Sequence, residues 1–171
     1  MAIVRGEKPE EHRAVEDLLR RAYGREDEAR LLASLRGSPD FVPQMSVVAD
    51  LDGILTGYAL FMKAVVAAEN ENYASLALVL LTVLPEYKLS GVAERLIRHS
   101  VERGRGLGLR LIFVIGEPRY FSMFGFRKAS DLGLEAEFEV SGGSLQVLPL
   151  QNDLPERING KVRYSKSIQP G

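Results

Sequence analysis

The chain has 171 residues, a formal net charge of −1 at pH 7, and a composition that is 46% hydrophobic and 26% charged. This length predicts one compact domain over residues 1–171, and the hydrophobic fraction is that of a globular protein. Because the chain has no cysteine and only two histidines, disulfides, a cysteine nucleophile and the common zinc sites are excluded, and we expect no metal. The near-neutral charge argues against nucleic acid as a partner.

No stretch of the sequence is apolar over the length of a membrane span. The longest apolar run covers residues 76–84, whereas a span needs about 20 residues. The start of the chain, MAIVRGEKPEEH, is charged and lacks the apolar segment of an export signal. We therefore expect a cytoplasmic protein that has no membrane partner.

The N-terminal part of the chain predicts one strand, two helices and a hairpin. A short strand is expected over residues 2–5, and apolar residues at helical spacing predict a helix over 9–23. A second amphipathic helix is expected over 26–36, where a glycine ends it. Strands over 45–51 and 54–66 follow, and the Asp-Gly pair between them is typical of a hairpin turn.

The rest of the chain predicts a strand–helix–strand unit followed by shorter elements. A very apolar strand over 73–83 is expected to be buried on both faces, and a helix over 91–103 follows it. The remaining expected elements are a strand over 110–115, a short helix over 119–124, a hairpin of 138–141 with 144–150 around Gly142-Gly143, and a strand over 161–164.

Glycines are expected to interrupt these elements at two places. Gly57 predicts a weak point or bulge in its strand, and Gly104, Gly106 and Gly108 are expected to end the preceding helix. The order of elements predicts a mixed α/β or α+β protein in which helices cover the faces of a single sheet.

The most informative segment is the junction between the central strand and the following helix. The strand ends at Pro85, and a short loop leads to a helix start that contains Gly91 and Ala93. Small residues let a ligand approach the backbone, and free N–H groups at a helix start favour phosphate. The alternative is a plain strand-to-helix connection with a glycine near the helix cap.

The charge distribution is uneven around this junction. Residues 85–128 contain nine Lys or Arg and four Glu, which gives +5 and leaves −6 for the remainder. A basic centre suits a polyphosphate ligand, although some of these arginines are expected to be solvated helix faces.

Two motifs resemble the signatures of one superfamily. The run LTVLPEYKLSGVAERLI resembles the acyl-CoA motif V-x-P-x-x-[QR]-x-x-G-x-[GA] of the GNAT (Gcn5-related) N-acetyltransferases, with Lys88 at the position of Gln or Arg. The later run GEPRYFSMFGFRKASDLGL resembles the second signature, an aromatic residue followed by F-G-F. The C-terminal run INGKVRYSKSI looks like that of the bacterial YhbS-like predicted acetyltransferases.

This resemblance implies a GNAT-like mixed, mainly antiparallel twisted sheet flanked by helices, with splayed central strands. It implies acetyl-CoA as cosubstrate, with the pantetheine arm pairing along the end of the central strand and the pyrophosphate on the amides that follow. Ser90, at a position that is often basic in the family, supplies no charge but has a hydroxyl for capping. The implied cofactor-binding residues are Leu81, Thr82, Val83, Lys88, Leu89, Ser90, Gly91, Val92, Ala93 and Glu94.

The catalytic side chains are harder to assign. The family's general acid is a tyrosine four residues before the glycine of F-G-F, and Phe121 stands there. The neighbouring Tyr120 is the candidate general acid, the alternative being a partly buried aromatic whose hydroxyl is hydrogen-bonded. Glu71 is the candidate base, with Glu69 as the other choice, and both also fit ordinary solvated acids at a strand end.

The resemblance implies an N-acetyltransferase that moves an acetyl group from acetyl-CoA directly to a primary amine, because no cysteine is available for an acyl-enzyme. Acidic residues near the expected acceptor side favour a cationic amine. The alternatives are a non-catalytic acyl-CoA-binding or regulatory module on the same fold, and a structural protein with a decayed phosphate loop. Since members of this superfamily are often dimers, a homodimer is one expectation. The acidic residues in question are Glu26, Asp27, Glu28 and Asp40.

Overall fold

The structure, a computed structural model, describes residues 1–140 and 144–169. These residues divide into two compact units. The first consists of Met1–Phe61 and Val79–Ser100, and the second consists of Met62–Leu78 and the chain from Val101 onward. Strands β3 (Ile54–Ala68) and β4 (Asn72–Val83) and helix α3 (Val92–Gly106) contribute residues to both units.

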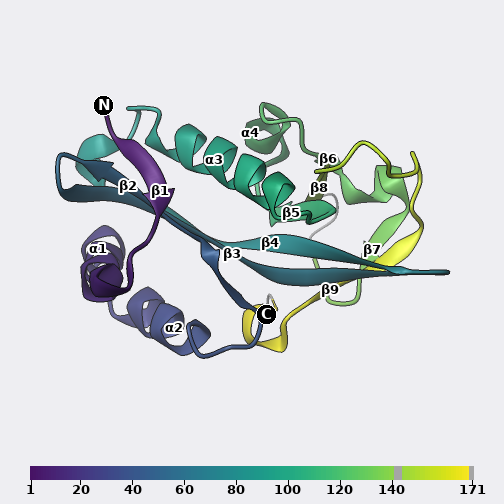
Figure 1. The fold of residues 1–171 in the computed structure, drawn as a ribbon, viewed down its shortest axis with the longest axis horizontal. Coiled ribbons are helices and arrows are strands. Elements are labelled where there is room, and N and C mark those ends of the chain that lie inside the picture. The colour runs from purple at the N-terminus through teal and green to yellow at the C-terminus, as the bar shows by residue number, and fades with distance from the viewer. Residues whose placement is uncertain (141–143, 170–171) are drawn as a thin grey trace. The chain divides into compact units, whose positions relative to one another are not determined.

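The first unit contains the N-terminal strand, two helices and a hairpin. In Figure 1, α1 and α2 lie on one side of β2 and the start of α3 lies on the other. The expected elements of this region are all present, with ends that shift by a few residues. Besides parts of β3, β4 and α3, the elements are β1 (Ile3–Gly6), a 3-10 turn (Pro9–Glu11), α1 (His12–Tyr23), α2 (Asp27–Leu35) and β2 (Phe41–Leu51).

The helix and turn signals of the first unit act as expected. Helix α1 buries the apolar stripe of Val15, Leu18 and Leu19, and it ends where Gly24 takes a left-handed conformation with φ of +68°. Asp52 and Gly53 both have positive φ, at 51° and 90°, which is the geometry of the tight hairpin turn predicted for this pair.

Gly57, where the sequence predicted a weak point or bulge, is a position of close packing. A Cβ atom at Gly57 would lie 2.9 Å from Val92 Cγ1, 3.1 Å from Leu96 Cδ1 and 3.1 Å from the carbonyl oxygen of Thr82. The first turns of α3 therefore approach β3 more closely than any side chain would allow.

The second unit is built mainly from antiparallel pairs. β5 pairs with β8, β8 with β6, and β3 with β9, all antiparallel, whereas β4–β5 and β7–β9 are parallel. In the described residues the sheet order is β1-β2-β3-β4-β5-β8-β6, with β9 beside β3 and β7 beside β9. The further elements are β5 (Leu111–Ile115), α4 (Pro118–Ser122), β6 (Arg127–Lys128), β7 (Leu134–Ala136), β8 (Leu145–Pro149) and β9 (Gly160–Tyr164).

Two predictions about the second unit need correction. Helix α3 runs through Gly104 and ends at Gly106, and Gly108 follows with a φ of +79°, so Gly106 and Gly108 lie at the helix end as predicted but Gly104 does not. A Cβ at Gly104 would lie 3.0 Å from Leu76 Cδ1. That glycine is a packing position rather than a helix terminator. Residues 138–140 form no strand, and the strand of this region is β7, which pairs with β9. Gly142-Gly143 lie outside the described residues.

Helix length also bears on the membrane question. None of the helices within residues 1–140 and 144–169 has both the length and the apolar character needed to cross a membrane.

An ion-pair cluster joins β1, β2 and the turn before α1. The Arg5 guanidinium donates to both carboxylate oxygens of Glu11 at 2.8 Å and to Oδ2 of Asp50 at 2.8 Å. These charge-assisted bonds lower the pKa of Glu11 to about 2, chiefly through the hydrogen bonds from Arg5. Because the folded pKa is depressed, this stabilisation is complete above the unfolded pKa and is lost as pH falls towards 2.

We expect Gly57→Ala to lower the free energy of unfolding by about 1–3 kcal/mol, because the new methyl group collides with α3 and with backbone. Gly6→Ala is the matched control, since a Cβ there meets nothing within 4 Å. Urea unfolding followed by circular dichroism measures both variants. Equal stability of the two variants would contradict the close approach.

We expect Glu11→Gln to lower the free energy of unfolding by about 1–2 kcal/mol at pH 7, because a charged acceptor of the Arg5 guanidinium is lost. The difference in the free energy of unfolding between Glu11→Gln and the unchanged protein should become smaller as the pH falls from about 5 to about 3.5. Across that range the unfolded carboxyl takes up a proton, while the folded carboxyl stays ionised against Arg5. Urea unfolding at several pH values tests this, and a difference that stays constant would refute the assignment.

Candidate functional site

The segment that joins β4 to α3 is an exposed loop with an unusual backbone. Strand β4 ends at Val83, and a 3-10 turn over Pro85–Tyr87 follows. Leu89 and Gly91 then adopt positive φ values of 69° and 81° before α3 begins. Leu89, a non-glycine residue in this sparsely populated region, is also fully exposed. This conformation turns the chain abruptly into the helix.

The helix start leaves three amides outside the hydrogen-bond ladder of α3. The N–H of Arg95 donates to the Gly91 carbonyl at 3.1 Å, which makes it the first bond of the α3 ladder. The N–H groups of Val92, Ala93 and Glu94 precede this bond and have no partner within the helix ladder. The side chains of Lys88 and Ser90 just before them are exposed. Amides and helix dipole together favour an anion here.

Ser90 differs from its expected role. Its hydroxyl donates to the carbonyl of Tyr87, and its own N–H donates to the same oxygen at 3.3 Å. The side chain therefore stabilises the turn of the loop rather than the start of the helix.

The last turn of α1 contacts the end of β4 and the loop. The Tyr23 hydroxyl lies 2.9 Å from Thr82 Oγ1, and Arg21 forms an ion pair with Glu86. Sequence analysis did not single out Tyr23 or Arg21. No motif contains them, and Tyr23 is 59 positions away from Thr82 in the chain. Thr82 is buried, whereas its neighbours Leu81 and Val83 are half-buried.

Part of the positive charge of residues 85–128 serves the fold. Arg105 donates to the Leu150 carbonyl at 2.9 Å, and Arg110 donates to Asp153 at 3.2 Å. The Arg110 guanidinium also lies 5.5 Å from the centre of the Tyr73 ring. Closer to the loop, a hollow of about 380 Å³ between β1 and α3 is lined by Ile3, Val4, Arg95, Arg98 and His99.

The acidic residues near α2 are largely offset by arginines. Glu26 binds Arg20 at 2.8 Å, and Glu28 binds Arg25. The hydrogen bond from Arg25 holds the pKa of Glu28 below its ordinary value. Asp27 also lies 3.9 Å from Arg25. These pairs weaken the electrostatic preference for a cationic acceptor that the sequence indicated.

The candidate catalytic residues belong to the second unit. Tyr120 is half-buried on α4, with its ring 5.2 Å from Phe121 and 5.5 Å from Phe124. Glu71 is exposed in the turn between β3 and β4, where its carbonyl accepts the N–H of Ala68 at 3.0 Å. It precedes Leu81 by ten residues along β4, an extended length of up to about 33 Å.

Phe121 has a structural explanation. The side chain is only 6% exposed, and a Cβ placed on Gly116 would lie 2.7 Å from its ring. The ring also packs edge-on against Phe126 at 5.8 Å. Phe121 therefore anchors α4 to the strand end, which is a role for an apolar ring rather than for a proton donor.

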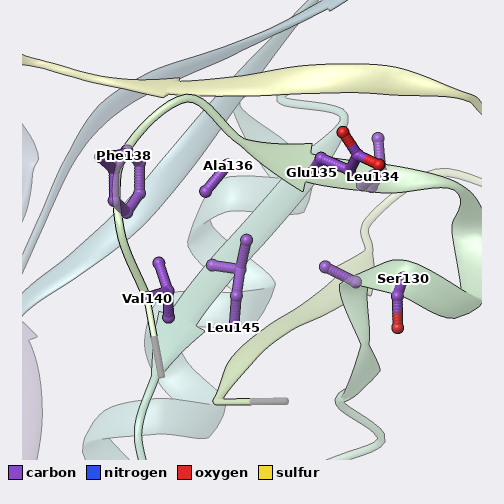
Figure 2. Close-up of a pocket in the computed structure, with 8 residues that line it drawn as sticks. Ser130, Leu134, Glu135, Ala136, Phe138, Val140 and Leu145 are labelled. Atoms are coloured by element: carbon purple, nitrogen blue, oxygen red, sulfur yellow. The ribbon is translucent and has the colours of Figure 1, made fainter. Parts of the chain in front are cut away.

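The second unit also contains a cavity of about 260 Å³. Figure 2 shows Ala136, Phe138, Val140 and Leu145 around it, contributed by β7, β8 and the segment between them. Glu135 lies at the same site, and its carboxylate forms an ion pair with Lys161. None of the residues predicted from the sequence lines this cavity. The described residues also contain no group of acidic or histidine side chains that could hold a metal.

Comparison with known proteins agrees with the strand–loop–helix geometry. A sequence model described as an acetyltransferase (GNAT) domain matches residues 4–129. The Escherichia coli K12 protein named uncharacterized N-acetyltransferase YjhQ is 36% identical over 121 residues, which cover 70% of this chain and 67% of that protein. The uncharacterized N-acetyltransferase YhbS of the same strain is 27% identical over 162 residues, or 95% of each chain.

Solved structures show the same fold. The crystal structure of YhbS from Escherichia coli in complex with CoA has a TM-score of 0.84 and 26% identity, and the match covers 97% of this chain and 91% of that one. A GNAT family acetyltransferase from Brucella melitensis in complex with acetyl-CoA has a TM-score of 0.74 at 22% identity, with coverage of 98% and 97%. On this evidence, the chain belongs to the GNAT family of acetyltransferases and is similar to YhbS.

Proposed function

We propose that this protein transfers an acetyl group from acetyl-CoA directly to the primary amine of an acceptor. The observation that carries the proposal is the exposed loop before α3, after which the amides of Val92, Ala93 and Glu94 lie outside the helix ladder. The pyrophosphate of acetyl-CoA binds at Lys88–Glu94, and Lys88 keeps the side-chain hydrogen-bond donor that Gln or Arg supplies at its motif position. The complexes of similar proteins with CoA and acetyl-CoA support this assignment.

The end of β4 is the proposed site of the pantetheine arm. The amide groups of the pantetheine arm form hydrogen bonds with the backbone of Leu81–Val83. One backbone N–H of this segment polarises the thioester carbonyl. The half-buried side chains of Leu81 and Val83 provide apolar contact. Since binding uses main-chain groups, the site tolerates variation of the side chains. The splay of the central strands that would admit this arm is part of the proposal.

The reaction needs a neutral amine, a stabilised oxyanion and a protonated leaving group. The amine nitrogen attacks the thioester carbon, the C–N bond forms and the C–S bond breaks, and CoA leaves as a thiolate that takes a proton. Tyr120 is the proposed donor of that proton. Glu71, the candidate base, lies ten residues along an extended strand from Leu81, which is too far for one water to bridge, so the amine proton is not assigned to it. A thiol with a pKa near 8.5 leaves readily, so the demand on the acid is modest.

A second candidate function is acyl-CoA binding without turnover. The burial of Phe121, at the position where the family's tyrosine acid is expected, favours it. We further propose that residues 1–171 act as one domain, in the cytoplasm and as a homodimer.

We expect Gly91→Val to weaken acetyl-CoA binding at least about tenfold, because a β-branched residue resists the positive φ that shapes the loop. Gly108→Val is the matched control. Gly108 has a φ of +79°, against +81° for Gly91, and a Cβ meets nothing within 4 Å at either position. Both variants should lose similar stability, and only Gly91→Val should lose the heat of binding in a calorimetric titration. Absence of acetyl-CoA binding by the unchanged protein would refute the proposed function.

We expect Tyr120→Phe to lower kcat roughly 100-fold while leaving acetyl-CoA affinity unchanged, because only the proton donor is removed. CoA release is measured with the best acceptor from a panel of amines, polyamines, amino acids and peptides. Tyr164→Phe is the control, since that buried hydroxyl lies in the same unit and has no hydrogen-bond partner in the described structure. Glu71→Gln should leave kcat within about twofold, because its carboxylate lies far along β4 from the thioester site. If acetyl-CoA binds but no acceptor of the panel leads to CoA release, acyl-CoA binding without turnover is the favoured function.

A further inference from the structure

We propose that Tyr23 is a positioning residue for acetyl-CoA, which holds the end of β4 in its binding conformation through its hydroxyl bond to Thr82. This inference rests on the proposed function and adds to it a residue that lies outside both family motifs. It also gives the last turn of α1 a part in cofactor binding.

The geometry of the contact is specific. Tyr23 Oη and Thr82 Oγ1 are 2.9 Å apart, and Thr82 is only 5% exposed. Thr82 lies between Leu81 and Val83, whose backbone is the proposed partner of the pantetheine arm. Loss of the Tyr23 hydroxyl would leave the buried Thr82 hydroxyl without this bond, and the strand end would move to find another.

Tyr23 is 40% exposed, but its backbone belongs to a capped helix end. It is the last residue of α1, and the Gly24 N–H caps the helix by donating to the Arg20 carbonyl at 2.8 Å. The Arg25 guanidinium lies 6.0 Å from the centre of the Tyr23 ring and also pairs with Glu28. The tyrosine therefore reaches Thr82 from a defined helix end rather than from a mobile loop.

A second contact reinforces the first. Arg21 pairs with Glu86 in the 3-10 turn that follows β4, so one helix end touches both sides of Leu84. This ion pair is exposed and contributes little by itself. The bond between the Tyr23 and Thr82 hydroxyls is therefore the main positioning contact.

The Tyr23–Thr82 bond is proposed to raise the affinity for acetyl-CoA by fixing the end of β4 before acetyl-CoA binds. If the strand end is already extended, acetyl-CoA binds without first ordering it. Without the hydroxyl bond, only a fraction of molecules has a competent strand, and the apparent Kd rises in inverse proportion to that fraction. The chemical step, in which Tyr23 has no part, is unaffected once acetyl-CoA is bound.

The test compares Tyr23→Phe, Thr82→Val and the double variant by calorimetric titration with acetyl-CoA. We expect each single variant to raise the Kd about fivefold, and the double variant to be no weaker than either single one. Thr82→Ser keeps the hydroxyl and should restore the affinity. In turnover, the KM for acetyl-CoA should rise while kcat stays within about twofold.

Tyr58→Phe separates positioning from general loss of stability. Tyr58 lies in the same unit, and its hydroxyl is 2.6 Å from that of Ser46. This variant removes a similar bond at a different place, so it should lower stability and leave the Kd unchanged. An equal rise of Kd in Tyr58→Phe and Tyr23→Phe would overturn the proposal.

Amide hydrogen exchange gives a readout that needs no ligand. Exchange in a peptide covering residues 81–88 should be faster in Tyr23→Phe than in the unchanged protein, and unaltered in Tyr58→Phe. Unchanged exchange and unchanged Kd in Tyr23→Phe would overturn the positioning role while the proposed function stands. If exchange is faster in Tyr23→Phe but the unchanged protein does not bind acetyl-CoA, the Tyr23–Thr82 contact is supported and the proposed function is refuted.

Discussion

The close approach of α3 to β3 at Gly57 is the constraint on which the candidate site depends. Because no side chain stands between them, Val92 and Leu96 pack directly against the strand. The Thr82 carbonyl lies at the same point, so strand β4 and the start of α3 are fixed against one position of β3. The loop between them has to make a sharp turn, and the positive φ values of Leu89 and Gly91 are the result. The packing of α3 against β3 at Gly57 therefore sets the position of the amides at the helix start.

In the proposed function, cofactor binding and catalysis depend on different parts of the chain. Cofactor binding is assigned to backbone groups, whose direction is set by the strand and helix that carry them. Catalysis is assigned to side chains, and here the chain departs from its family at Phe121, which packs against Gly116 and Phe126 as a core residue. An aromatic residue at this position thus supports α4 whether or not it carries a hydroxyl.

Local chemistry accounts for what could be predicted from the sequence. The amphipathic stripe of α1, the Asp52-Gly53 turn and the apolar run of β4 each encode their structure within a few residues, and the structure confirms them. The glycines could not be interpreted in the same way. Gly57 and Gly104 are glycine because of atoms contributed by residues far along the chain, and the sequence alone indicated a bulge and a helix end. Strands β6 and β7 were missed because two or three residues are too short to show a period.

The sequence by itself determined the family, the order of the main elements and the loop that is proposed to bind acetyl-CoA. It could do so because these features depend on motifs and on periodicity within short segments. Only the tertiary structure decided which acids and arginines are already paired, why Phe121 is buried, and that Tyr23 meets Thr82. These facts depend on side chains that are 59 positions apart, as for Tyr23 and Thr82, and no local pattern connects such residues. Contacts of this kind exist only once the helices and strands have packed.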